Sequence, residues 1–206
     1  MSSTAIEARD LAKSYGGPPL FVRLSLRAES GLTAVAGRNG SGKTTLLKIL
    51  AGLLRPDEGT VRVERAGARL SGEPLRLAVG WAGQDLNLYE DLTALENLTF
   101  FRRAAGAHAD RGEIGRRLEE VDLAYAADQR VGGFSTGMKQ RLRVAFATLF
   151  DPPILLLDEP MAGLDVSGRE LVARLIAARR RNGAVFLASN DERDFVQPDQ
   201  TLSLGR

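Results

Sequence analysis

The chain has 206 residues, of which 44% are hydrophobic and 26% are charged, and its formal net charge at pH 7 is +2. This composition is close to that of an average soluble domain, which argues against intrinsic disorder. The near balance of charge, without a long basic run, argues against a nucleic-acid partner. Cysteine is absent, which excludes a disulfide framework and a thiolate metal site.

The N-terminal segment mixes charged and apolar residues, unlike a secretory signal, and nowhere do about 18 uncharged apolar residues run together. We therefore expect a cytoplasmic protein that reaches the inner face of a membrane only through partner subunits.

Short apolar runs alternate with helical patterns along the chain, which is typical of an α/β domain with a mainly parallel sheet. Residues 32–36 are a predicted buried strand, and leucines at helical spacing from Leu46 to Leu54 predict a helix that begins near Lys43. Further strands are expected at 22–28, 60–64, 77–82, 154–157 and 184–189. The pieces before Leu32 are candidates for an antiparallel edge.

Residues 86–134 are charged, rich in alanine and helix-forming, as the segment 113–121 illustrates. We expect a single domain over 1–206, with 86–134 as a helical subdomain inserted in the α/β core.

The segment 37–45 reads Gly-Arg-Asn-Gly-Ser-Gly-Lys-Thr-Thr and fits the phosphate-loop pattern G-x-x-x-x-G-K-[ST]. Its glycines let backbone N–H groups turn inward around phosphate oxygens, and the following helix points its positive end at the same anion. Lys43 would reach the β- and γ-phosphates, and the Thr44 hydroxyl would bind Mg²⁺. The predicted nucleotide-binding residues are Gly37, Arg38, Asn39, Gly40, Ser41, Gly42, Lys43, Thr44 and Thr45. The alternative is a glycine-rich turn that matches by chance.

Two carboxylates, Asp158 and Glu159, end the predicted strand 154–157. A strand that is buried on both faces places them at the carboxyl edge of the sheet, where the phosphate loop also opens. Asp158 would hold Mg²⁺ and Glu159 would polarise the attacking water, because phosphoryl transfer needs mainly positioning and charge neutralisation. The alternative is a strand end that carries solvated acids.

A third motif lies at 134–141, Phe-Ser-Thr-Gly-Met-Lys-Gln-Arg. Ser135 is a good N-cap, and Leu142, Ala145 and Phe146 continue as an apolar helix stripe. The segment resembles the Leu-Ser-Gly-Gly-Gln signature of ABC ATPases at Ser135 and Gly137, and it departs from that motif at the three positions around them. Taken alone, the segment is better explained as an ordinary capped helix that packs on the core.

The order of motifs strengthens this resemblance and extends it over essentially the whole chain. ABC cassettes carry the motifs Walker A, Q-loop, signature, Walker B and D-loop in this order. The corresponding residues here follow in the same order: Lys43, Gln84, Ser135, the acidic pair and Asp165. The resemblance implies a P-loop α/β fold of the ABC type that binds Mg-ATP.

The family also implies partners and further roles. Two cassettes, here expected as a homodimer, would pack head to tail with each ATP between the phosphate loop of one and the signature helix of the other. Integral membrane subunits would read the ATP cycle. Gln84 would contact Mg²⁺ and the attacking water, and Asp165 would communicate across the dimer. Tyr15 would stack on adenine, unless it is an ordinary edge-strand aromatic.

Asn190 departs from the family pattern, because it lies where cassettes of this type usually carry a switch histidine. The single histidine, His108, is expected in an exposed loop of the helical subdomain. An asparagine amide can donate a hydrogen bond to a phosphate but cannot relay a proton. We expect ATP binding to be retained and hydrolysis to be slower, with Asn190 acting beside Glu159 and Gln84.

The sequence thus resembles the ATP-binding subunit of an ABC transporter, with features of exporter cassettes and of the short cassette of cytochrome c maturation systems. A second hypothesis is a weakly hydrolytic, nucleotide-switched assembly module in such a membrane complex. A soluble ABC ATPase of DNA repair or translation would carry a long coiled coil or a second cassette. A nucleotide kinase would not need Gln84, Ser135 and Asp165 in this order.

Overall fold

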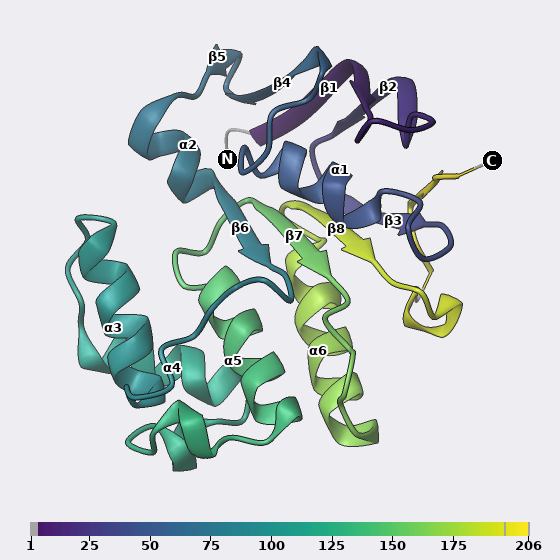
Figure 1. The fold of residues 1–206 in the computed structure, drawn as a ribbon. Coiled ribbons are helices and arrows are strands. Elements are labelled where there is room, and N and C mark those ends of the chain that lie inside the picture. The colour runs from purple at the N-terminus through teal and green to yellow at the C-terminus, as the bar shows by residue number, and fades with distance from the viewer. Residues whose placement is uncertain (1–3, 196, 206) are drawn as a thin grey trace.

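The structure is a computed structural model, and it describes residues 4–195 and 197–205. A parallel sheet lies in the middle of the molecule, with helix α1 and an antiparallel sheet on one side and helices α5 and α6 on the other (Figure 1). The strands are β1 (Thr4–Lys13), β2 (Phe21–Ala28), β3 (Gly31–Ala36), β4 (Glu58–Arg65), β5 (Ala68–Arg69), β6 (Val79–Ala82), β7 (Ile154–Asp158), β8 (Ala184–Ala188) and β9 (Gln200–Ser203). The helices are α1 (Lys43–Leu50), α2 (Gly72–Ala78), α3 (Ala94–Ala104), α4 (Arg111–Glu120), α5 (Thr136–Ala147) and α6 (Val166–Arg179), with short 3-10 helices η1 (Ala124–Ala126), η2 (Val131–Gly133) and η3 (Glu192–Asp194).

The parallel sheet has the strand order β6-β7-β8-β3-β9, and its neighbouring strands run in the same direction. Strands β7 and β8 are buried along their whole length, as the continuous apolar sequence predicts for strands covered on both faces. The α/β class and the mainly parallel sheet expected from the sequence are therefore confirmed.

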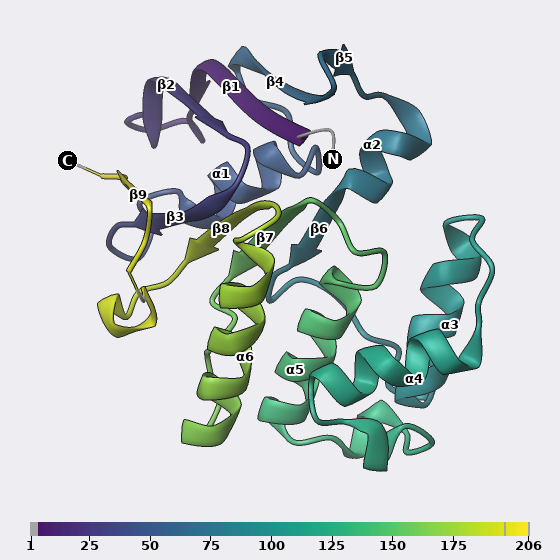
Figure 2. The same ribbon diagram turned by 180° about the vertical axis from the view of Figure 1, so that it is seen from behind.

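The antiparallel sheet has the order β2-β1-β4-β5 and lies next to α1 (Figure 2). The expected antiparallel edge before Leu32 is confirmed, and it forms a sheet of its own. Strand β4, predicted at 60–64, belongs to this sheet because it pairs with β1.

Two predicted elements extend at least two residues too far. The strand expected at 77–82 begins only at Val79, because 77–78 end helix α2, in which Pro74 occupies a first-turn position that needs no backbone N–H. Helix α1 ends at Leu50 and does not extend to Leu54. Gly52 has a φ of 73°, and the N–H of Leu53 donates to Lys48 O at 2.9 Å, as in a Schellman C-terminus.

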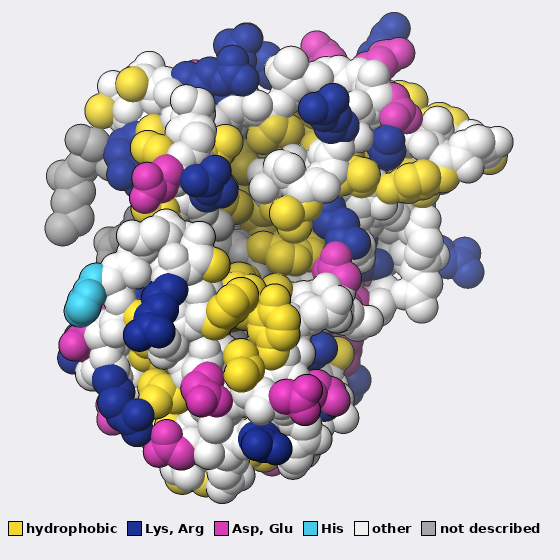
Figure 3. Space-filling model, turned by 60° about the vertical axis from the view of Figure 1, so that its left-hand side comes forward, with side chains coloured by type: hydrophobic (Ala, Val, Ile, Leu, Met, Phe, Trp, Pro, Cys, Tyr) yellow, Lys and Arg dark blue, Asp and Glu magenta, His cyan; other side chains and the backbone are white. Residues whose placement is uncertain are grey.

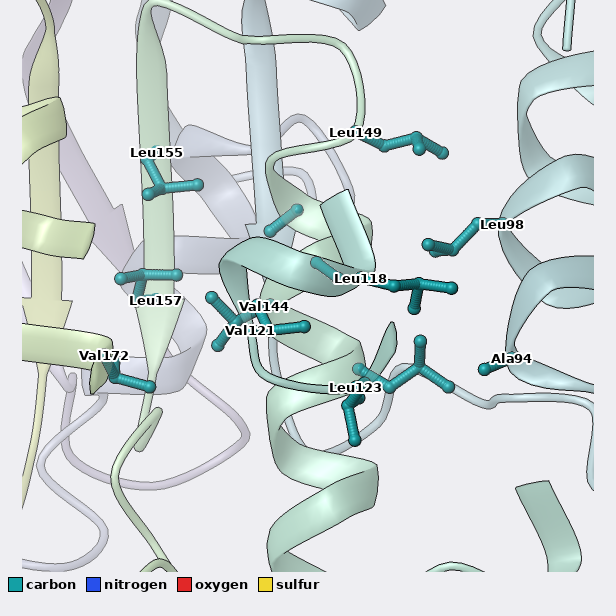
Figure 4. Close-up of a cluster of buried hydrophobic side chains, with 14 of the residues drawn as sticks. Ala94, Leu98, Leu118, Val121, Leu123, Val144, Leu149, Leu155, Leu157 and Val172 are labelled. Atoms are coloured by element: carbon teal, nitrogen blue, oxygen red, sulfur yellow. The ribbon is translucent and has the colours of Figure 1, made fainter. Parts of the chain in front are cut away.

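The two faces of the parallel sheet bury different hydrophobic clusters. Ile154 and Leu156 pack on the side of α1, whereas Leu155 and Leu157 pack on the side of the helices. Successive side chains of a strand point to opposite faces, so one apolar run serves both clusters. Figure 4 shows Leu155 and Leu157 in the cluster that also contains Val144 of α5.

The helical region lies at the end of the molecule away from the antiparallel sheet (Figure 1). Helices α3 and α4 fall within 86–134, and α3 begins with a capping box formed by Thr93 and Glu96. Helix α5 lies beyond this range, yet Leu142 shares a buried cluster with Leu98 of α3 and Leu118 of α4. The subdomain limits 86–134 and the single domain 1–206 stay predictions.

Candidate nucleotide-binding site

The loop between β3 and α1 ends in a helix N-terminus that has no side-chain cap. Its N-cap residue is Gly42, with a φ of 99°, and within the described residues no side chain caps the first amides of α1. A Cβ at Gly42 would lie 3.0 Å from Leu20 Cβ, and Gly40 also has a positive φ of 80°. The glycines therefore allow the backbone conformation, and the open amides leave room for an anion.

Lys43 is the first residue of α1 and only 7% exposed. Its ammonium group donates to Gly37 O at 2.7 Å, to Arg38 O at 3.2 Å and to Asn190 Oδ1 at 2.7 Å. These three acceptors match the three donors of a lysine. The structure thus brings the predicted Lys43 and Asn190 into direct contact, although 147 positions separate them.

Thr44 and Asp158 meet across the end of β7. The Thr44 hydroxyl donates to Asp158 Oδ2 at 2.7 Å, and Asp158 is 4% exposed. Burial raises the pKa of the Asp158 carboxyl, and the Thr44 hydrogen bond partly offsets this effect. Oxygen donors of this kind suit Mg²⁺, which keeps several water or phosphate ligands. The described residues contain no group of three or more carboxylate or imidazole side chains that could hold a metal alone.

Glu159 follows β7 with a φ of 51°, in the left-handed region that is uncommon for a glutamate. Its Oε1 is buried and has no hydrogen-bond partner within the described part of the chain. Burial raises the pKa of its carboxyl, and the Asn190 backbone N–H lowers it in part. The buried Gln140 of α5 donates to Glu159 O at 3.0 Å and fixes this backbone. Buried, under-bonded carboxylates of raised pKa are typical of functional sites.

These side chains line one cleft of about 500 Å³. The predicted residues that line it are Tyr15, Asn39, Gly40, Gly42, Lys43, Thr44, Thr45, Gln84, Asp158, Glu159 and Asn190. Tyr15 is 66% exposed at the rim of the cleft. Its ring is therefore accessible for stacking on a planar group. The cleft thus contains both predicted acids and the predicted lysine.

Three predicted loop residues contribute backbone or packing and do not line the cleft. Gly37 and Arg38 offer their carbonyl oxygens to Lys43. The Ser41 hydroxyl is buried under the loop, where a Cβ on Gly37 would lie 2.4 Å from it, and it has no hydrogen-bond partner in the described residues.

Ser135, Gly137 and Asp165 lie together at a second place, outside the cleft. Ser135 caps α5 by accepting from the Met138 N–H at 3.2 Å, as its sequence position predicts. Asp165 caps α6 by accepting from the Gly168 N–H at 2.8 Å. A Cβ on Gly137 would lie 3.3 Å from Gly163 O, so the start of α5 packs on the loop before α6.

Sequence reasoning missed Leu20, Lys48 and Asp85 in the cleft and Gln140 beneath it. Lys48 pairs with Asp85 at 2.9 Å across the cleft. Lys48 could have been found, because it lies four residues after Thr44 and hence on the same face of α1. His108 lies where it was expected, exposed in the loop between α3 and α4.

Comparisons with known proteins identify the family of this chain. The family model of the ABC transporter matches residues 22–162. The chain is 36% identical over 191 residues to the bacitracin transport ATP-binding protein BcrA of Bacillus licheniformis. The match covers 91% of this chain and 62% of that protein. It is 36% identical over 185 residues to the cytochrome c biogenesis ATP-binding export protein CcmA of Brucella abortus (strain 2308), which covers 89% of this chain and 84% of that protein.

The dimeric structure of the ABC transporter cassette MJ0796 has the same fold, with a TM-score of 0.81 at 24% identity over 97% of this chain and 94% of that chain. The chain therefore belongs to the ABC transporter family, as an ATP-binding cassette. It spans 62% of the length of the bacitracin protein. Among the described residues, no helix combines the length and the apolar character that a bilayer crossing requires.

Proposed function

We propose that the chain binds Mg-ATP in the cleft at the N-terminus of α1 and hydrolyses it. The observation that carries this proposal is the convergence of Lys43, Thr44, Asp158 and Glu159 on one cleft from two distant segments. The open amides of α1 and Lys43 would hold the phosphates, and Tyr15 would stack on the base. Mg²⁺, held by Thr44, Asp158 and Gln84, would neutralise the charge on the transferred phosphoryl group.

In this proposal Glu159 orients and polarises the attacking water. Its Oε1 is buried without a partner among the described residues, and burial raises its pKa, so this carboxylate is well suited to accept a hydrogen bond from water. Gln140 supports the role by holding the Glu159 backbone from α5.

Asn190 would make the hydrolysis slow. A lysine has only donors, so the Asn190 oxygen must face Lys43, and its NH₂ group faces elsewhere. That amide can still donate to a phosphate oxygen, but it cannot become a cation or carry a proton. We therefore expect turnover below that of cassettes with histidine at this position.

A second copy would complete the site. Ser135, Gly137 and Asp165 lie outside the cleft of their own chain, and a head-to-tail homodimer would bring the α5 N-terminus of one copy to the ATP of the other. The related cassette MJ0796 forms a dimer, which supports this arrangement. Phe134, Thr136 and Met138 would then border the phosphate site in place of the family's usual residues.

The proposed membrane partner would dock in an apolar groove of about 560 Å³ between α2, β6 and α5. In Figure 3 hydrophobic side chains gather in a hollow on this side of the molecule. Its lining residues include Leu53, Leu75, Leu86, Phe146 and Phe150. Because the loop after Gln84 borders both the groove and the ATP cleft, a helix of an integral membrane subunit seated here would sense nucleotide binding. The protein would thus be peripheral at the cytoplasmic face.

Export is the direction suggested by the relative named for cytochrome c biogenesis export. The second candidate function is a nucleotide-switched assembly module of low turnover, which the relative in cytochrome c biogenesis and Asn190 favour. Steady-state ATPase rates with and without the membrane partner separate the two, because a transporter motor is stimulated by its partner and a switch is not.

The experiment that tests the proposed activity is Glu159→Gln. The amide keeps the shape but cannot act as a base, so the ATPase rate should fall about a hundredfold to ten-thousandfold while ATP affinity changes little. Phosphate release and nucleotide titration measure the two quantities. A variant that retains a tenth or more of the wild-type rate would remove Glu159 from this role.

A further inference from the structure

A chain of buried polar contacts connects Glu159 to helix α6, and the proposed hydrolysis does not use it. Ser189, 2% exposed, follows β8, and its hydroxyl oxygen lies 3.3 Å from Glu159 Oε2 and 2.6 Å from Asp194 Oδ2. Asp194, 6% exposed in η3, receives a hydrogen bond from Arg169 at its other oxygen, at 2.8 Å. Asp191 N–H donates to the Ser189 oxygen at 3.0 Å.

The distances decide where the Ser189 proton lies. A serine hydroxyl has one hydrogen to donate, and here two carboxylates compete for it. The contact of 2.6 Å with Asp194 has the length of a strong charge-assisted hydrogen bond, whereas 3.3 Å to Glu159 lies beyond the usual range for an O–H donor. Ser189 therefore donates its hydroxyl hydrogen to Asp194 and makes only a weak contact with Glu159.

We propose that Asp194 is a positioning residue for hydrolysis: it holds the Ser189 proton away from Glu159, so that this carboxylate stays free to accept a hydrogen bond from the attacking water. This inference rests on the proposed ATPase activity with Glu159 as the base. It assigns a role to Asp194, and through it to Arg169, which fixes the Asp194 carboxylate from α6.

The substitution Asp194→Asn keeps the shape of the side chain but reverses the direction of its hydrogen bond with Ser189. Arg169 has only donors, so the new amide must turn its oxygen to Arg169 and its NH₂ group to Ser189. Ser189 then accepts from that amide and from Asp191 N–H. The remaining acceptor within its reach is Glu159 Oε2, which receives the serine proton that the wild type withholds.

The test is a double-mutant cycle on the full chain, read by steady-state ATPase kinetics. Asp194→Asn should lower kcat about tenfold, because the new hydrogen bond to a charged group must be broken or weakened in the transition state. KM should stay within about twofold, since the substitution does not touch the phosphate-binding residues. In the Ser189→Ala background the same substitution should change kcat by less than about twofold, because no hydroxyl proton remains to redirect.

Equal losses of kcat in the two backgrounds would overturn the proposal, since Asp194 would then act without Ser189. An unchanged kcat in Asp194→Asn would also overturn it. If Asp194→Asn alone no longer folds or binds ATP, as thermal unfolding and nucleotide titration would reveal, the residue is structural and the proposal is wrong. A wild-type chain that binds ATP without hydrolysing it would instead refute the proposed activity.

Discussion

Helices α1 and α5 both begin where the sequence predicts a phosphate contact, but their N-termini are built differently. Helix α1 starts after Gly42, and no side chain in the described part of the chain caps its first amides. Helix α5 starts after Ser135, whose hydroxyl already accepts from the Met138 N–H. Because the first four N–H groups of a helix lack intrahelical partners, the end of α1 is open to an anion and that of α5 is partly closed.

The surroundings of the two ends differ in the same sense. The α1 end lies in a cleft beside Lys43, Asp158 and Glu159, whereas Ser135 lies outside that cleft. On the surface of α5, Lys139 pairs with Glu90. We therefore propose that the α1 end of one chain and the capped α5 end of a neighbouring copy together form one site. The following three changes test this division of roles.

The largest effect is expected at the open end. Lys43→Ala removes the ammonium group that would contact the β- and γ-phosphates, so ATP affinity should fall at least about a hundredfold. Lys48→Ala is the matched control, because Lys48 lines the same cleft but pairs with Asp85. Lys48→Ala should lower ATP affinity by less than about tenfold. Isothermal titration with ATP measures both, and similar losses would show that Lys43 has no special place.

A smaller, opposite effect is expected at Asn190. Asn190→His supplies an imidazole that can carry a proton at neutral pH, so kcat should rise about two- to tenfold. Asn190→Ala is the control, because it removes the oxygen that accepts from Lys43 and adds nothing. Phosphate release by the assembled complex is the measurement. If the rate of Asn190→His is unchanged or lower, Asn190 is not the cause of slow turnover.

The smallest effect is expected at the closed end. Ser135→Ala removes the cap of α5 and should lower the free energy of unfolding by about 1 kcal/mol. In the monomer ATP affinity should not change, because Ser135 lies outside the cleft. Urea unfolding and ATP titration at low protein concentration measure the two. Asp165→Ala, which removes the cap of α6, is the control for stability. Weaker ATP binding by the Ser135→Ala monomer than by the wild-type monomer would show that the α5 end contributes to the cleft of its own chain.

The local motifs were predictable from the sequence because their chemistry lies in consecutive residues. The phosphate loop depends on glycines at fixed spacing before Lys43, and Asp158 and Glu159 end a continuous apolar strand. A serine before a helical pattern predicts the cap at Ser135, and the structure confirms it. In each case neighbours along the chain determine the conformation.

The rest of the site depends on contacts that the order of residues does not reveal. Asn190 was assigned a contact with phosphate, but its bond to Lys43 requires β8 to pair beside β3. Gln140 meets Glu159 only because α5 packs below β7. The leucine spacing suggested a longer α1, since periodicity does not register the C-terminus at Gly52.

The most direct test of the account is the mass of the Glu159→Gln protein in solution with and without Mg-ATP. If the open end of α1 in one copy and the capped end of α5 in another enclose the nucleotide, sedimentation should detect monomers without ATP and homodimers with it, at one ATP per chain. A protein that binds one ATP per chain and stays monomeric at every concentration would contradict the account.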